Sequence, residues 1–129
     1  MGAFTGDIQI LLYVEPESFA PCSAFYQALL ERPPYYTWEE EDSDRGAKFH
    51  AGGGTICVLC QDHLSEIGPS TISLETADVD RVYEKAQRLP GVRILTAPMT
   101  RPYGTRCFQM QDPVRNILNV YCLGQDQSI

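Results

Sequence analysis

The chain has 129 residues, of which 43% are hydrophobic and 21% charged, a composition typical of a single globular domain. Ten basic and seventeen acidic residues give a net charge of −7, which argues against a nucleic-acid partner, because phosphate binding needs clustered Lys and Arg. No apolar run approaches the roughly 18 residues of a membrane span, and the five scattered cysteines read as buried thiols in a reducing compartment, so we expect a cytoplasmic protein with no membrane partner.

The first half of the sequence predicts four strands and one helix. Runs of β-branched and aromatic residues predict strands at 8–14, 35–38, 47–51 and 55–60. Apolar residues at helical spacing follow Ser18, the expected N-cap, and end before Pro33, with Pro21 in the first turn. The acidic stretch at 39–42 is expected to form a solvated hairpin face.

The second half predicts the same order of elements. Strands are expected at 71–75, 92–97, 105–111 and 117–122. Between the first two of them, Asp78 is expected to cap a helix that Pro90 and Gly91 end.

These elements describe an internal repeat of the form βαβββ. An offset of 62 residues relates Gln9 to Thr71 in the first strands and Cys57 to Asn119 in the last strands. The sequence therefore predicts an α+β fold of two tandem modules, at residues 1–62 and 70–123. A linker at 63–69 and a frayed tail at 124–129 complete the division of the chain.

A groove between the two sheets is the expected binding site. A helix covers one face of each sheet, so two curved mixed sheets can enclose a groove with the helices outside. Strand alternation points a mixed polar and aromatic set into it, as a small-molecule site requires. The set consists of Gln9, Leu11, Tyr13, Thr55, Cys57, Leu59, Thr71, Ser73, Glu75, Ile117, Asn119 and Tyr121.

Aromatic side chains are the leading candidates for ligand contacts. Trp38, Tyr36 and Tyr103 join Tyr13 and Tyr121 here, since aromatic faces stack on planar ligands and attract cations. Sheet packing is the alternative role, because strands favour aromatic residues in any case. The acidic stretch offers a way to steer a cationic ligand.

The whole pattern resembles the vicinal oxygen chelate superfamily, which includes glyoxalase I, extradiol dioxygenases, and the fosfomycin- and bleomycin-resistance proteins. The resemblance is carried by residues 13–15 (YVE), 24–26 (AFY), 49–55 (FHAGGGT), 72–75 (ISLE), 78–80 (DVD), 98–99 (PM), 103–106 (YGTR), 112–116 (DPVRN) and 120–121 (VY). Arg115 stands where the family usually has a glycine, so a differently shaped turn is expected there.

The resemblance implies four metal-ligand positions, which are usually His or Gln, Glu, His and Glu. This chain has Gln9, Cys57, Thr71 and Asn119 there, and only Gln9 fits the pattern. Imidazole or carboxylate ligands are what such metals prefer, so we expect no metal and no cofactor. Cys57 then reads as a small buried residue. Glu75 is the candidate general base, and an ion pair with Arg93 or Arg106 is its alternative role.

The resemblance is strongest to the metal-free bleomycin-resistance branch. It implies a protein that sequesters a small molecule, cationic or aromatic, in the groove without a metal. The alternative is a divalent-metal-dependent lyase, isomerase or dioxygenase of the same superfamily with an atypical site. We also expect a homodimer, and whether the modules pair within one chain or across two is left open.

Overall fold

The computed structural model describes residues 8–61, 70–102 and 104–123. The predicted linker, the predicted tail and the candidate Tyr103 lie outside the described residues. Within the described ranges, no helix has the length and apolar character needed to cross a membrane.

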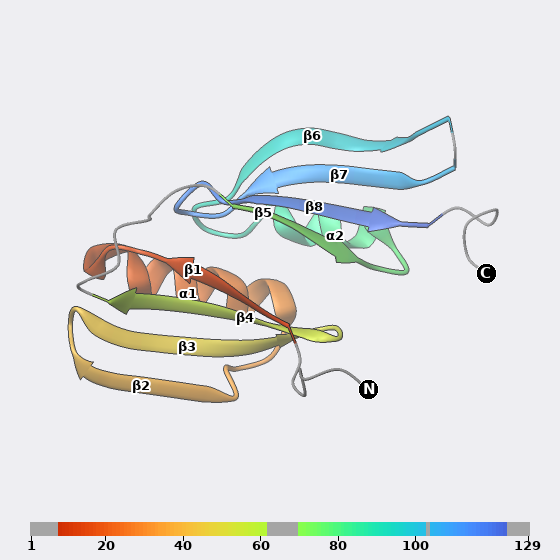
Figure 1. The fold of residues 1–129 in the computed structure, drawn as a ribbon. Helices are drawn as coiled ribbons and strands as arrows, with labels where there is room; N and C mark the ends of the chain where they lie inside the picture. The colour runs from red at the N-terminus through yellow and green to blue at the C-terminus, as the bar shows by residue number, and fades with distance from the viewer. Residues whose placement is uncertain (1–7, 62–69, 103, 124–129) are drawn as a thin grey trace, which may run out of the picture.

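The first module, at the bottom of Figure 1, has one helix on a four-stranded sheet. Its strands are β1 (Gln9–Tyr13), β2 (Tyr36–Glu41), β3 (Asp44–Ala51) and β4 (Gly54–Gln61), and its helix is α1 (Pro16–Leu30). The sheet order is β1-β4-β3-β2, and β1 runs parallel to β4 because the crossover through α1 separates them.

The second module repeats this arrangement and lies above the first in Figure 1. Its elements are β5 (Thr71–Glu75), α2 (Val79–Ala86), β6 (Arg93–Thr100), β7 (Arg106–Gln111) and β8 (Ile117–Cys122), with the sheet order β5-β8-β7-β6. Two four-stranded mixed sheets, each with its helix, confirm the predicted α+β fold of tandem βαβββ modules.

The strand register confirms the repeat in detail. In the first sheet Gln9 is paired with Thr55, and in the second Thr71 is paired with Ile117, so both partners move by the same 62 residues. The four following pairs of each ladder obey the same offset. Because a slip of one residue would turn every side chain to the other face, the two sheets present equivalent positions on equivalent faces.

The helix ends differ in part from the prediction. Asp78 caps α2 as expected, since its carboxylate accepts a hydrogen bond from the backbone N–H of Arg81 at 3.1 Å. Ser18 does not cap α1, which starts two residues earlier at Pro16, after the extended residue Glu15. Proline suits the first position of a helix, because the N–H that it lacks would have no partner there. Pro21 consequently lies in the second turn rather than the first.

The two modules meet on their helix sides. The Tyr26 hydroxyl of α1 donates to the Asp112 carboxylate, in the turn after β7, at 2.6 Å. Lys85 of α2 donates to the Leu29 carbonyl at 3.4 Å and forms an ion pair with Glu31 at 3.0 Å. Buried side chains from both modules form one continuous core there. The predicted groove between the helix-free faces of the sheets is thus not where these contacts lie, and it stays a prediction.

Candidate functional site

The side of each sheet that carries no helix is called its bare face here. Residues directly opposite each other on neighbouring strands point to the same side, so the register defines the rows of each bare face. In the first sheet the rows are Gln9–Thr55–His50, Leu11–Cys57–Lys48–Tyr36 and Tyr13–Leu59–Gly46–Trp38. In the second they are Thr71–Ile117–Gln111–Arg93, Ser73–Asn119–Gln109–Thr96 and Glu75–Tyr121–Cys107–Met99.

All twelve side chains predicted for the groove lie on these two bare faces. Thr55, Cys57 and Leu59 on β4 are buried by their neighbours, while Leu11 at the sheet edge is 44% exposed. On the other edge, Tyr36 is 54% exposed. The second and third rows of the first bare face are therefore largely apolar, and the chain itself leaves this face open at its edges.

Trp38 packs flat against the sheet in the third row. Its indole Nε1 donates to the Asp44 carboxylate at 3.1 Å. Its six-membered ring lies so close to Gly46 that a Cβ at this position would come within 2.2 Å of it. Only glycine leaves room for the ring there, so Gly46 and Asp44 together fix the orientation of Trp38.

A cavity of about 300 Å³ opens beside Trp38, at the outer edge of the first sheet. Phe19 and Ser23 of α1, together with Thr37 and Glu39 of β2, contribute to its lining. Trp38 was predictable as a ligand contact from the sequence, whereas Phe19 and Ser23 were not, because both fit the ordinary apolar and polar pattern of a helix. The acidic stretch begins at this edge, where Glu39 forms an exposed ion pair with Arg45 at 3.7 Å.

Polar groups gather in the first row of this bare face. The Tyr35 and Thr55 hydroxyls share a hydrogen bond of 3.0 Å. The Tyr35 ring stacks on the His50 imidazole, with ring centroids 4.0 Å apart and planes 12° from parallel. Tyr35 was expected only as part of a strand. It directly precedes β2, and its backbone N–H donates to the Lys48 carbonyl at 2.8 Å, which holds it beside β3.

The second bare face is more polar than the first. Thr71, Ser73 and Glu75 on β5 are exposed, and the Asn119 amide donates to the Ser73 hydroxyl at 3.4 Å. The Arg106 guanidinium does not reach Glu75, because it donates two hydrogen bonds of 2.8 Å to Asp80. Glu75 also lacks, within its own chain, the burial on which a carboxylate general base depends.

The side chains at the four metal-ligand positions that the resemblance implies do not suit a divalent ion. Gln9, Thr71 and Asn119 are neutral, and burial raises the pKa of the Cys57 thiol even though the nearby Lys48 ammonium lowers it. The thiolate is the form that binds metal, so this shift disfavours Cys57 as a ligand. Among the residues that the structure describes, no three His, Cys, Asp or Glu side chains are grouped to hold an ion.

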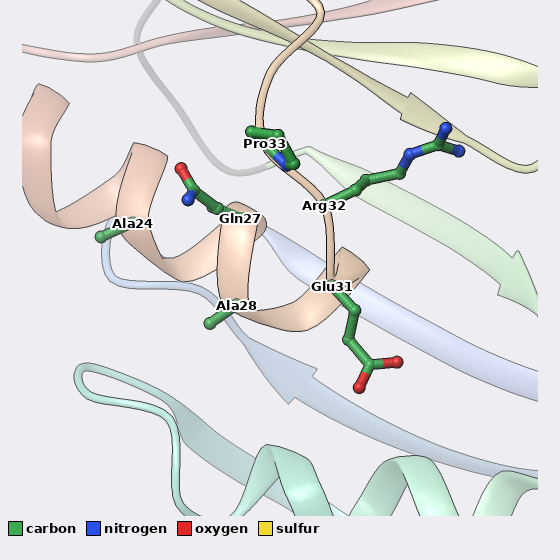
Figure 2. A pocket seen from close by; sticks show the side chains of 6 residues that line it. All are labelled: Ala24, Gln27, Ala28, Glu31, Arg32 and Pro33. Carbon is green, nitrogen blue, oxygen red and sulfur yellow. The ribbon is translucent and has the colours of Figure 1, made fainter.

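Two cavities on the helix side contain none of the predicted site residues. One, of about 490 Å³, lies along the last turns of α1 and the residues after it, where Glu31 and Arg32 extend in different directions (Figure 2). The other, of about 370 Å³, is apolar and lies where α1 meets Pro90, Gly91 and Pro113 of the second module. Gln27, Glu31 and Arg32 contribute to the lining of the first cavity, and apolar side chains line the second, without a cluster of catalytic groups in either.

Solved structures share this architecture. A lactoylglutathione lyase from Agrobacterium tumefaciens superposes with a TM-score of 0.73 at 14% identity, over 97% of this chain and 98% of its own. A glyoxalase/bleomycin resistance protein from Catenulispora acidiphila gives 0.68 at 19% identity, over 92% and 99%. A chain described as a conserved domain protein gives 0.72 at 24% identity, over 92% and 99%.

These likenesses show that the chain has the fold of the glyoxalase, bleomycin resistance and dioxygenase proteins, which is the vicinal oxygen chelate fold. Comparison of the sequence with protein-family models and with curated proteins gave no match. The assignment of the fold class therefore depends on structural similarity, and the activity has to be inferred from the candidate site.

Proposed function

We propose that this protein binds a small aromatic or cationic molecule against its bare faces without a metal, in the manner of a resistance protein that sequesters its ligand. The observation that carries the proposal is the donor set at Gln9, Cys57, Thr71 and Asn119. It replaces ionisable metal ligands with neutral hydrogen-bonding groups and a thiol held in its protonated form. A cytoplasmic location is part of the proposal, and the five unpaired cysteines support it.

The proposal includes a homodimer in which the bare faces of two chains enclose the ligand. Large apolar side chains are exposed on both bare faces, including Leu11 at 44%, Tyr36 at 54% and Met99 at 47%. The described contacts between the modules of one chain lie on the helix side and leave these side chains uncovered. A second chain would bury them, which favours pairing of a first-module face with a second-module face across two chains.

Metal titration separates this proposal from a metal-dependent enzyme of the same fold. We expect the melting temperature of the purified protein to stay unchanged when Ni²⁺, Mn²⁺ or Zn²⁺ is added. A metal at a hundredfold excess over its Kd would add about 2.7 kcal/mol to the stability of the folded state. Such a stabilisation, lost again in the Gln9→Ala variant, would overturn the metal-free proposal.

Trp38 provides the test of ligand binding. The neutral aromatic dye N-phenyl-1-naphthylamine reports binding by its own fluorescence. We expect Trp38→Ala to weaken dye binding by about tenfold, because one aromatic contact contributes roughly 1–1.5 kcal/mol. The same substitution should change the melting temperature of the protein much less than it changes the affinity for the dye. A large loss of melting temperature alongside the loss of dye affinity would show that Trp38 only packs the sheet. Absence of dye binding to the unaltered protein would contradict the proposed function.

A further inference from the structure

Lys48 places a positive charge in the middle of the first bare face. It lies on β3, between Cys57 on one side and Tyr36 on the other, in the row that begins with Leu11. Its ammonium lies 5.5 Å from the centre of the Tyr36 ring. The charge therefore lies beside an aromatic ring, in a row whose other members are Leu11, Cys57 and Tyr36.

No carboxylate forms an ion pair with Lys48 in the described part of the chain. The ion pairs found there engage Arg45, Lys85 and Arg106 instead. Asp44 shares β3 with Lys48 but lies four residues away, about 13 Å along the strand. Its carboxylate also already accepts the hydrogen bond from Trp38. An ammonium on an apolar surface without a counter-ion is a strong anchor for an anion, because water screens it less there.

Further donors lie in the row next to Lys48. His50 is two residues along the same strand, which is about 7 Å, and Tyr35 stacks on it. The Thr55 hydroxyl and the Gln9 amide occupy the same row. These groups donate hydrogen bonds as readily as they accept them, so they suit the oxygens of an acidic group.

We infer that the ligand of this site is an aromatic anion, whose carboxylate, sulfonate or phosphate group is bound by Lys48 on the first bare face. This inference rests on the proposed function and decides between its two ligand classes. The aromatic part of the ligand lies on Leu11 and Tyr13, and its acidic group reaches Lys48 and the row of His50. A cationic ligand would meet the Lys48 charge at the centre of the face.

A matched pair of dyes tests the inference. 8-Anilinonaphthalene-1-sulfonate and N-phenyl-1-naphthylamine share one aromatic frame, and only the first carries a negative group. We expect the unaltered protein to bind the sulfonate at least about fivefold more tightly, as a single charge-assisted contact allows. In Lys48→Met this preference should disappear while the affinity for the neutral dye is retained, and in Lys48→Arg it should persist.

Arg88→Gln is the matched control, because it removes an exposed positive charge just after α2, on the helix side. It should leave the preference intact. Equal affinity of the unaltered protein for the two dyes, or a preference that survives Lys48→Met, would overturn the inference while the proposed function stands on the neutral dye. Failure of both dyes to bind would overturn the inference and the proposed function together.

Discussion

Asp112 shows how one residue joins the two modules. It is only 2% exposed, and a buried carboxylate is costly unless hydrogen bonds replace its water. Four donors do so here: the Tyr26 hydroxyl at 2.6 Å, the Asn116 amide at 2.9 Å, and the backbone N–H groups of Val114 and Asn116, both at 2.9 Å. Burial and the Asp112 charge together raise the pKa of Tyr26, so its hydroxyl keeps its proton and remains a donor.

Removing the Tyr26 hydroxyl should therefore destabilise the whole protein. We expect Tyr26→Phe to lower the free energy of unfolding by about 1–3 kcal/mol, because it leaves a buried carboxylate short of one donor. Urea denaturation followed by circular dichroism measures the loss. Tyr83→Phe is the control, since the Tyr83 ring packs on Phe108 in the same core without a hydrogen bond from its hydroxyl among the described residues. Similar small losses in both variants would contradict the role given to Tyr26.

Among the elements, the turn between β7 and β8 places a residue with a long side chain in a backbone conformation that favours glycine. Arg115 was expected to change the shape of this turn, because it replaces a glycine. The structure shows instead that Arg115 itself adopts the left-handed conformation, with φ of 75°. Asp112 explains how, since its carboxylate and carbonyl bind the N–H groups of Val114, Arg115 and Asn116 and hold the backbone there.

Glycine should consequently be preferred at this position. We expect Arg115→Gly to raise the free energy of unfolding by about 0.5–1 kcal/mol, because it relieves the cost of a left-handed side-chain-bearing residue. Arg115→Val should lower it, since a β-branched residue tolerates positive φ least. Thermal and urea unfolding of the two variants measure the difference, and the reverse order of stability would rule out backbone strain as the cause.

α2 is attached to its sheet by a paired charge at its first turn. Arg106 on β7 donates two hydrogen bonds to Asp80, and these lower the pKa of the Asp80 carboxyl. The folded state then binds the proton of the Asp80 carboxyl less tightly than the unfolded chain does, so the ion pair with Arg106 contributes to stability at neutral pH. It is lost as the pH falls below the ordinary aspartate pKa of about 4.

An NMR titration of the carboxyl carbons tests this pair. We expect the Asp80 pKa to rise toward its ordinary value in Arg106→Gln, while the Glu31 pKa, which Lys85 lowers, stays where it was. Because Asp80 is exposed, the change in overall stability should be small. An Asp80 pKa that does not respond would mean that the ion pair is not formed in solution.

The elements also show what sequence reasoning can and cannot reach. β5 and β8 match their predicted bounds, because alternation in each is bounded by clear turn residues. β6 runs to Thr100, three residues past its prediction, through Pro98. It is an edge strand, where a residue without an N–H costs little, but only the sheet order reveals that.

At the scale of the whole molecule, the packing of the two modules against each other could not be predicted from local sequence patterns. Tyr26 and Asp112 stand 86 positions apart, and nothing in either neighbourhood marks them as partners. The faces of the candidate site were predictable from strand alternation. The position of Lys48 in the row between Cys57 and Tyr36 was not, since it follows from the pairing of β3 with β2 and β4.

The proposed dimer gives a prediction at this scale. We expect Leu11→Glu to shift the protein toward monomer in sedimentation velocity at micromolar concentration, because the substitution places a charge in the apolar contact between two chains. Gln87→Glu adds the same charge at an exposed position next to α2 and should leave the association unchanged. Sedimentation of the unaltered protein as a monomer would contradict the proposed homodimer directly.

The continuous core shared by the modules has a consequence for how the chain loses its structure. Two repeats that were only tethered would melt independently, each at its own temperature. Here the buried acid of the second half depends on a phenol from the first, so neither half can open without exposing groups of the other. The duplicated chain should therefore behave as one cooperative unit, with a single calorimetric transition.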